Sequence, residues 1–334
     1  MSFLDIKGQQ RAITILKKFI ENKSINSSFL FFGRPGIGKH LTALNMAKAI
    51  NCSGEKQWAW LSDDTCVSCK KIENNIHPDV MQITVPIPDE SSQMETMVRV
   101  IEWLHMPLFE GKQKILIVDD ASELNVHAQN AMLKTLEEPL PWVTIIFITS
   151  SYARLLPTVQ SRLIKVGFNR LSEQSIKEIL ASITDLNEEQ LNYLSFLSDG
   201  GIKYTAPDDI ENDVKKMIAL LAELKEPASM VKLAEKFKLQ NYKEHFEQIV
   251  DIMLSFFIDA VLIQNNPGLI RNEGFQQEIT AFSRQFRTHA IINAAASLEK
   301  ARSAYETAKH RMTARSGETR IEMMDRVFFE RVRE

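Results

Sequence analysis

The fold of the first half of this chain is decided by the stretch GRPGIGKH at Gly33–His40. It follows an apolar run that predicts a β-strand and opens a segment that predicts a helix, which is the context of a phosphate-binding loop (P-loop). Glycines at this spacing let backbone N–H groups turn toward phosphate, and the helix N-terminus adds positive potential. The predicted nucleotide-binding residues of the loop are Gly33, Gly36, Gly38 and Lys39.

The last position of the loop departs from this pattern. A P-loop carries Ser or Thr there, whose hydroxyl holds Mg²⁺, and this chain has His40. An imidazole is a poor ligand for a hard cation that prefers oxygen. We therefore expect phosphate binding to be possible and metal-assisted hydrolysis to be badly weakened. The alternative is that His40 is a surface residue in the first helical turn.

Two carboxylates, Asp119 and Asp120, end a second apolar run at residues 115–119. In P-loop hydrolases the first acid assists Mg²⁺ and the second, usually Glu, polarises water. Asp120 is one methylene shorter than Glu, and a misplacement of about 1 Å can cost on the order of 100-fold in rate. The alternative is that both acids are solvated residues at a strand end.

An α/β fold with a parallel sheet is predicted for the first half, because short β-rich runs alternate with helical patterns. One helical pattern places Met94, Met97, Val98, Ile101 and Leu104 on a common apolar face, and another spans residues 128–136. Each predicted strand is a run rich in Val, Ile, Phe or Leu, as burial on both faces requires. These strands are residues 29–32, 80–85, 115–119, 143–149 and 163–168.

After residue 168 the sequence predicts helices and no convincing strand. Ser172 and Asn187 have the character of helix N-caps, and Gly200-Gly201 marks a break. Longer helical patterns cover residues 208–225, 241–264, 274–286, 288–308 and 317–332. The domains predicted from this layout are a P-loop domain with a cysteine-containing insert at 1–168, a small helical lid domain at 169–210 and an all-helical domain at 211–334.

Composition limits the classes of partner and the location. The net charge is −3 and the isoelectric point about 6.2, so any contact with nucleic acid is expected to be shared with partner chains or confined to one face. No long apolar run predicts a membrane span, and the N-terminus lacks the pattern of a signal peptide. We expect a cytoplasmic protein. In that reducing compartment its three cysteines, Cys52, Cys66 and Cys69, favour metal binding over a disulfide.

Several segments together carry a resemblance to a known family. They are Gly8-Gln9, Glu110–Lys112, Ile115–Asp119, Asn130–Pro139 with its LKTLEEP run, and Leu156–Arg162. With these segments the chain resembles the AAA+ clamp-loader family of bacterial DNA polymerase III. The resemblance implies a three-domain subunit of a five-membered ring that opens a sliding clamp and places it on primed DNA in replication. It also implies partners: delta and gamma/tau motor subunits, the clamp, and DNA held within the complex.

The same resemblance assigns roles to single residues. Arg162 matches the family's arginine finger, which acts in trans on the nucleotide of a neighbouring subunit, although the family's usual Cys after it is Leu163 here. Thr149 stands where the family places its first phosphate sensor, and Lys203 stands where motor subunits carry a second. The degenerate loop favours the subunit type that hydrolyses no ATP, with ATP and Mg²⁺ bound weakly or not at all. The third domain would form the ring's collar.

A zinc module is implied as well. The family has a four-cysteine zinc module inserted here, and Cys52, Cys66 and Cys69 match three of its positions. The fourth falls at Asp63, whose carboxylate can complete a tetrahedral zinc site. Asp64 and His77 are the alternatives, and a decayed module with free thiols is the rival interpretation.

Two other functions stay open. One is a competent AAA+ ATPase of the motor type, in which His40 and Asp120 are tolerated. The other is a small-molecule P-loop kinase, which should carry an arginine-rich lid and has no need of the helical second half. The large apolar side chains Trp58, Trp60, Met97 and Trp103 are interpreted as core packing or insert lining.

Overall fold

The computed structural model describes residues 2–85, 90–198, 200–202, 246–265 and 276–312. The chain divides into two compact units, one formed by Met1–Ile179 with Gly200–Lys203 and the other by Leu180–Asp199 with Tyr204–Glu334. The predicted division into three domains at 168 and 210 stays a prediction. The predicted helices at 208–225 and 317–332, and Lys203, lie outside the described residues.

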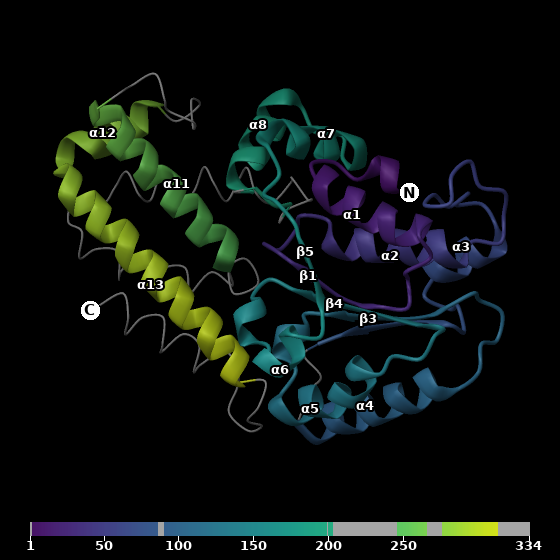
Figure 1. Ribbon diagram of the computed structural model, residues 1–334. Helices are drawn as coiled ribbons and strands as arrows, with labels where there is room; N and C mark the ends of the chain where they lie inside the picture. Colours follow the sequence, from purple (N-terminus) through teal and green to yellow (C-terminus); the bar gives the residue numbers. More distant parts are fainter. Residues whose placement is uncertain (1, 86–89, 199, 203–245, 266–275, 313–334) are drawn as a thin grey trace. The chain divides into compact units, whose positions relative to one another are not determined.

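A five-stranded parallel sheet forms the centre of the first unit, and it confirms the predicted α/β class (Figure 1). Its order is β2-β3-β4-β1-β5, with every neighbouring pair parallel. All five predicted strands are present, with ends that differ by at most one residue. They are β1 (Ser28–Phe32), β2 (Val80–Thr84), β3 (Lys114–Asp119), β4 (Val143–Thr149) and β5 (Ile164–Gly167).

The central strands form because their apolar runs can be buried on both faces. Every residue of β4 is buried, and so are the first five residues of β3. Phe29, Leu30 and Phe31 of β1 have no exposed surface. Such continuous burial requires helices on both faces of a parallel sheet. Figure 1 shows α1 and α2 on one face and α4 and α5 on the other.

The helices of this unit begin and end near the predicted positions. Ser172 caps α7, because its Oγ accepts the N–H of Ser175 at 3.1 Å. The helices are α1 (Gln10–Glu21), α2 (Lys39–Asn51), α3 (Val67–Glu73), α4 (Glu90–His105), α5 (Val126–Glu137), α6 (Pro157–Gln160) and α7 (Glu173–Ile183). Short 3₁₀ turns are η1 (Phe3–Asp5), η2 (Ala121–Glu123) and η3 (Tyr152–Arg154).

One prediction about apolar side chains was wrong, and a second holds only in part. On α4 the buried stripe runs through Met97, Val100 and Leu104, whereas Met94 and Val98 are 39% and 41% exposed. At 100° per residue, Met94 and Val98 lie at the edge of the buried stripe and Val100 lies inside it. The buried face is therefore rotated about the helix axis relative to the predicted face. Trp60 is buried as expected, whereas Trp58 is 56% exposed and does not pack in the core. Lining of the insert by Trp58 stays a prediction.

The second unit is helical in its described parts. It contains α8 (Glu188–Leu197), α11 (Phe246–Asn265), α12 (Gln276–Gln285) and α13 (Thr288–Met312). Helix α11 packs against both α12 and α13. The contact with α12 is aromatic, since the ring of Phe282 lies 5.1 Å from that of Phe256 and 5.8 Å from that of Phe257. Among the residues that the structure describes, no helix is both long and apolar enough to cross a membrane.

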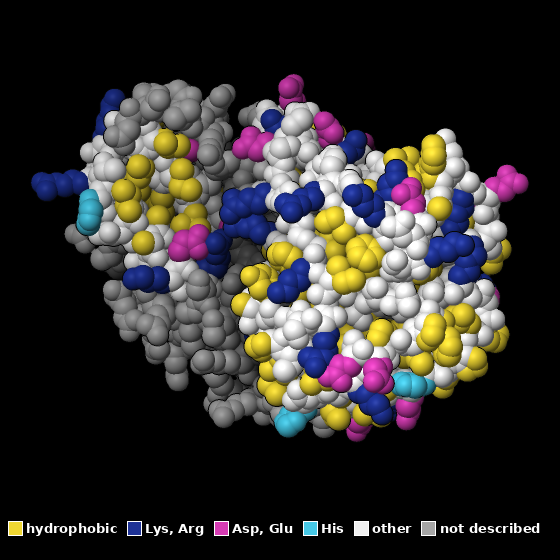
Figure 2. Space-filling view, viewed as in Figure 1, with side chains coloured by type: hydrophobic (Ala, Val, Ile, Leu, Met, Phe, Trp, Pro, Cys, Tyr) yellow, Lys and Arg dark blue, Asp and Glu magenta, His cyan; other side chains and the backbone are white. Residues whose placement is uncertain are grey.

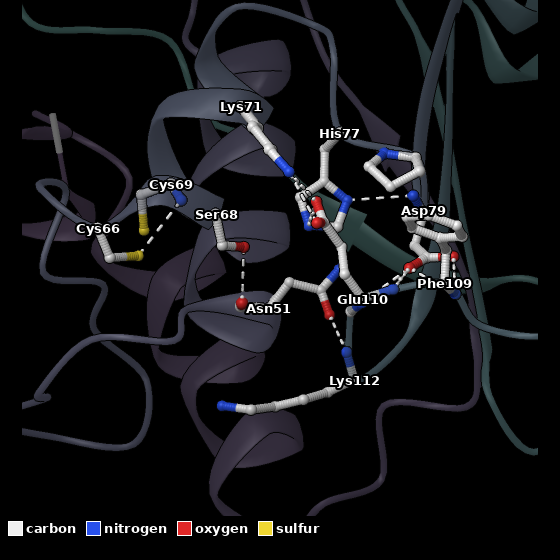
Figure 3. Close-up of polar contacts among 12 residues, drawn as sticks. Asn51, Cys66, Ser68, Cys69, Lys71, His77, Asp79, Phe109, Glu110 and Lys112 are labelled. Carbon is white, nitrogen blue, oxygen red and sulfur yellow. Dashed lines mark hydrogen bonds and ion pairs between the residues drawn. The ribbon is translucent and has the colours of Figure 1, made fainter.

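A buried carboxylate joins the starts of β2 and β3. Asp79 has no exposed surface, and its carboxylate accepts the backbone N–H groups of Phe109, Glu110 and Gly111 at 3.0, 2.8 and 2.7 Å (Figure 3). Lys114 Nζ lies 3.4 Å from the same carboxylate. Burial alone would raise the pKa of Asp79, but these hydrogen bonds hold it below its ordinary value. Asp79 therefore fixes the loop that leads into β3.

We predict that Asp79→Asn lowers the free energy of unfolding of the first unit by about 3 kcal/mol, because it leaves the buried Lys114 ammonium without its counter-charge. Urea unfolding followed by circular dichroism measures the change. Glu138→Gln, which neutralises an exposed carboxylate in the same unit, is the matched control. Equal unfolding midpoints for the two variants would contradict the role given to Asp79.

Candidate functional site

The P-loop lies at the carboxyl edge of the sheet, where three strands end side by side. Phe32 of β1 pairs with Thr149 of β4, and Gly33 N donates to Thr149 O at 3.3 Å. Asp119 ends β3, the neighbour of β4 on its other side. Helix α2 begins at Lys39, directly after the loop. Parallel strands bring their carboxyl ends to one edge, which is where open α/β sheets bind ligands.

The loop has the backbone that its glycines allow, and a distant segment lies against it. Gly33, Gly36 and Gly38 all have positive φ. Ile202 N donates to Gly36 O at 2.8 Å. A Cβ on Gly36 would lie 2.1 Å from Ile202 O, so no other residue fits at this approach. The sequence marked Gly200-Gly201 only as a break and gave no sign of this contact.

Lys39 is satisfied by the loop itself. Its Nζ donates to Gly33 O at 2.7 Å and to Arg34 O, and the residue is only 7% exposed. Burial lowers the pKa of Lys39 to about 8, although the charges of Asp119 and Asp120 oppose this shift. The lysine predicted to reach phosphate therefore bonds here to two carbonyl groups of its own loop.

His40 and Asp119 form an ion pair with each other. His40 Nδ1 donates to Asp119 Oδ2 at 2.9 Å. The hydrogen bond to Asp119 raises the pKa of His40, and burial opposes it. For Asp119 burial favours a raised pKa, but the hydrogen bond from His40 prevails and lowers it. The structure thus brings together the two residues that occupy the magnesium-ligand positions of a P-loop ATPase.

This pair does not fit Mg²⁺. The hydroxyl that should hold the ion is replaced by a nitrogen ligand, and Mg²⁺ demands oxygen ligands in near-octahedral geometry. The imidazole N–H also occupies one of the two Asp119 carboxylate oxygens.

The remaining residues predicted at this edge lie nearby. Asp120 adopts a left-handed conformation with φ 52°, and its N–H donates to Asp119 Oδ1 at 3.0 Å. Thr149 is fully buried, and its Oγ1 accepts the N–H of Ser151 at 3.0 Å. These contacts leave the roles of Asp120 and Thr149 toward a nucleotide as predictions.

The Gln9 side chain links the P-loop to Asn169 through hydrogen bonds, a role that the sequence did not predict. Its Nε2 donates to Ile37 O at 3.2 Å and to Asn169 O at 2.8 Å, and its Oε1 accepts the N–H of Asn169 at 3.0 Å. Gln9 is buried, with only 2% of its surface exposed. The Gly8-Gln9 pair was recognised as part of the family pattern, but the pair alone does not say which carbonyl groups the amide reaches.

Arg162 follows α6 and has contacts outside the P-loop. Its Nη1 donates to Thr158 O at 2.6 Å, and its Nη2 lies 2.5 Å from Glu137 Oε1 at the end of α5. The side chain is 32% exposed. None of these partners belongs to the chain's own nucleotide site, so the finger role stays a prediction.

The three cysteines and Asp63 form a compact cluster at the other end of α2. Cys52 caps the C-terminus of α2, Cys66 caps the N-terminus of α3, and Cys69 lies within α3. The four ligand atoms, one from each residue, all lie within 4.8 Å of one another. All three cysteines are free thiols.

The geometry of the cluster fits zinc. Cys52 Sγ and Cys66 Sγ lie 3.9 Å apart, and two sulfurs on one tetrahedral zinc at about 2.3 Å lie about 3.8 Å apart. Asp63 approaches because residue 54 is glycine, since a Cβ there would lie 1.5 Å from Asp63 Oδ2. Cys52, Asp63, Cys66 and Cys69 would hold the ion, which would supply a structural cross-link between α2 and α3.

Electrostatics in the cluster favour ionised ligands at two positions. Burial would raise the pKa of Cys66, but hydrogen bonds from Ser53 prevail and lower it to about 6. The backbone N–H of Cys66 lowers the pKa of Asp63. Burial raises the pKa of Cys69, and a bound cation is what lowers the pKa of such a thiol. Asp63 and Cys66 thus favour the ionised forms that bind a metal, whereas Cys69 needs a bound cation to ionise.

The cluster is tied firmly to α2. Ser68 Oγ donates to the carbonyl of Asn51 at 2.8 Å, and the side-chain oxygen of Asn51 accepts the N–H of Lys112 at 2.8 Å (Figure 3). Lys112 Nζ donates to Cys52 O at 2.7 Å. These bonds join the loop before β3 to the end of α2 beside the cluster.

The other two candidates for a fourth ligand lie elsewhere. His77 Nδ1 accepts the N–H of Asp79 at 3.1 Å, and burial lowers the pKa of its buried ring. Asp64 Oδ1 accepts a hydrogen bond from Ser62 at 2.9 Å and lies 3.4 Å from Lys48 Nζ. Of the three candidates, only Asp63 belongs to the described cluster.

We predict about one zinc ion per chain in protein purified without added zinc. Asp63→Asn should weaken zinc affinity by roughly tenfold or more, in the range known for lost support of a metal site, and Cys66→Ser should remove binding. Asp64→Asn, the neighbouring carboxylate, is the control and should bind normally. Metal analysis measures the zinc content, and titration with a competing chelator measures the affinity. Wild-type protein that carries no zinc would refute the site.

We also predict that His40 titrates above its ordinary pKa of 6.5 and that Asp119→Asn moves the value down. Because the folded-state pKa is raised, the pair stabilises the fold below about pH 6.5 and this contribution fades as pH rises through the folded value. NMR titration of the imidazole measures the shift, with Glu138→Gln as control. A wild-type value at or below 6.5 would contradict the pair.

A P-loop on a five-stranded parallel sheet, followed by helices, defines the fold of the P-loop ATPase class. The model of the family described as "DNA polymerase III, delta subunit" matches residues 8–172. The chain belongs to the AAA+ clamp-loader family of DNA polymerase III subunits.

Individual relatives differ in how much of their length is matched. DNA polymerase III subunit gamma of Buchnera aphidicola is 29% identical over 208 residues, which are 60% of this chain and 56% of that protein. The chain thus spans little more than half of that relative. Subunit delta' of Bacillus subtilis is 27% identical over 278 residues, 80% of this chain and 82% of that protein. A gamma-subunit-related protein of Thermotoga maritima is 18% identical, with a TM-score of 0.42 over 86% of this chain and 99% of that one.

Proposed function

We propose that this chain is a delta-prime-type subunit of a DNA polymerase III clamp loader. In this role it hydrolyses no ATP of its own and donates Arg162 to the nucleotide of a neighbouring subunit. The observation that carries the proposal is the ion pair between His40 and Asp119, because it joins the two side chains that would otherwise bind the magnesium of a hydrolysing site.

Two features of the site support the absence of hydrolysis. The metal-binding hydroxyl is missing, and Asp120 is shorter than the usual water-polarising glutamate. Each weakens a separate contribution to phosphoryl transfer, namely the metal and the oriented water.

The extent of the sequence matches points the same way. The match to the Bacillus subtilis delta' protein spans about four fifths of both chains. Matches to gamma and tau proteins cover 27% to 56% of the three relatives from Buchnera aphidicola, Haemophilus influenzae and Salmonella typhimurium. The tau protein of Bacillus subtilis is also matched over 80% of this chain, but that match covers only 51% of the tau protein. The share of the relative that is covered therefore supports the delta' type.

Arg162 supplies the chemistry that this subunit would lend. A guanidinium carries a planar fork of donors that matches two phosphate oxygens, and it stays charged at every physiological pH. Placed against the terminal phosphate of a neighbour's ATP, it stabilises the charge of the transition state. Arginine fingers contribute roughly 10³–10⁵ in rate at the site they serve.

The expected partners are the delta and gamma/tau subunits, the sliding clamp and primed DNA inside the assembled ring. The net charge of −3 supports a shared rather than a solitary DNA contact, since strong DNA binding by one chain alone usually requires a basic excess or stripe. On the face in Figure 2, Lys and Arg side chains lie in separate groups among apolar and acidic ones.

The competing proposal is a hydrolysing AAA+ ATPase. It requires that His40 leave Asp119 and that Lys39 leave the loop carbonyls when nucleotide enters. Purified chain without partners distinguishes the two, since magnesium-dependent ATP turnover by it would favour the competing proposal.

We predict that Arg162→Ala leaves the subunit folded and abolishes hydrolysis at one interface of the reconstituted loader, because the neighbouring site loses a finger worth roughly 10³–10⁵ in rate. Steady-state ATPase assays of the complex with clamp and primed DNA measure the loss. Arg154→Ala is the matched control, since Arg154 is an exposed arginine paired with Glu123. Unchanged ATPase with Arg162→Ala would refute the finger role.

A further inference from the structure

The guanidinium of Arg162 is engaged on both of its terminal nitrogens. Nη1 donates to Thr158 O at 2.6 Å and lies 3.3 Å from Ser161 Oγ. Nη2 lies 2.5 Å from Glu137 Oε1. The first set of partners belongs to α6 and the residue after it, whereas Glu137 is the last residue of α5, which packs against α6.

Glu137 stands at an electrostatically poor position for a carboxylate. The C-terminus of a helix carries partial negative charge from its unpaired carbonyl groups, so an acidic residue there is disfavoured unless a cation compensates. Arg162 supplies that cation. The contact is therefore more than an incidental meeting of two side chains, because the arginine offsets both the carboxylate and the helix end.

Carboxylate and phosphate bind a guanidinium in the same way. Both present two oxygens to the parallel N–H groups of the fork, with similar spacing and the same charge-assisted hydrogen bonds. An oxygen of Glu137 thus occupies the Nη2 edge that a phosphate oxygen would take. The Nη1 edge is bonded to a neutral carbonyl and a hydroxyl, which hold the side chain in place without neutralising it.

We propose that Glu137 is a positioning residue. Its carboxylate is a placeholder: it binds Arg162 where the phosphate of the neighbouring subunit's nucleotide would otherwise bind. This inference rests on the proposed finger role. When the neighbour binds ATP, the phosphate displaces Glu137 from Nη2 while the carbonyl of Thr158 keeps the guanidinium anchored. Glu137 then competes with nucleotide for the arginine and sets how much ATP is needed to engage it.

The exposure of the pair sets the size of the effect. Arg162 and Glu137 have side chains that are 32% and 48% exposed. Ion pairs this accessible to solvent are weak and readily exchanged, and their loss changes an equilibrium by about fivefold at most. A buried ion pair would keep Arg162 from reaching a phosphate. In this exposed pair, a multiply charged phosphate can displace Glu137 from the guanidinium.

The test uses the reconstituted loader with clamp and primed DNA, assayed over a range of Mg-ATP concentrations. Glu137→Gln keeps the size of the side chain and removes its charge. We expect the apparent KM for ATP to fall by about two- to fivefold while kcat changes less than twofold. Glu138→Gln removes the adjacent exposed carboxylate and should change neither constant.

A double variant separates this inference from the finger role. In the Arg162→Ala background, Glu137→Gln should have no further effect, because its partner is gone. An unchanged KM with Glu137→Gln alone would overturn the placeholder role, and so would a KM shift that persists in that background. Loss of ATPase with Arg162→Ala alongside either result would leave the finger role standing.

Discussion

The parallel pairing of β1 with β4, and of β4 with β3, is the constraint on which the rest of the first unit depends. It brings Gly33, Thr149 and Asp119 to one edge of the sheet, although more than 80 residues separate the first from the last two in sequence order. The pairing is held by continuous burial of β4 and most of β3, so Thr149 and Asp119 stand at the ends of buried strands. Their positions follow from packing rather than from contacts among themselves.

At that edge the polar groups satisfy one another. Lys39 bonds to loop carbonyls, His40 bonds to Asp119, and Ile202 N–H bonds to Gly36 O. In a hydrolysing P-loop ATPase these demands are met by phosphate and a metal ion. In this structure His40 and Asp119, which stand at the two metal-ligand positions, bond to each other.

Helix α2 links this edge to the cysteine cluster. It begins at the P-loop with Lys39 and ends at Asn51, with Cys52 as its cap. Its C-terminal end is fixed by Ser68, Lys112 and the cluster, while its N-terminal end is fixed by the loop and by Gln9 through Ile37. The cluster and the loop thus lie at the two ends of one helix, so a zinc ion held by the cluster would support the helix that begins at the P-loop.

The sequence by itself indicated the five strands and the loop between β1 and α2, because continuous apolar runs and short fixed spacings are local properties. The family resemblance predicted Cys52, Cys66, Cys69 and Asp63 as metal ligands, with Asp64 and His77 as alternatives to Asp63. Only the tertiary structure chose among these, since the choice depends on where the hydrogen bonds of 62–66 and 77–79 direct each side chain. The tertiary structure likewise decided that Gln9 supports the loop, that Ile202 lies against Gly36, and that Glu137 engages Arg162. Each of these contacts joins residues that are far apart in sequence or on different helices, and no local pattern encodes such a distance.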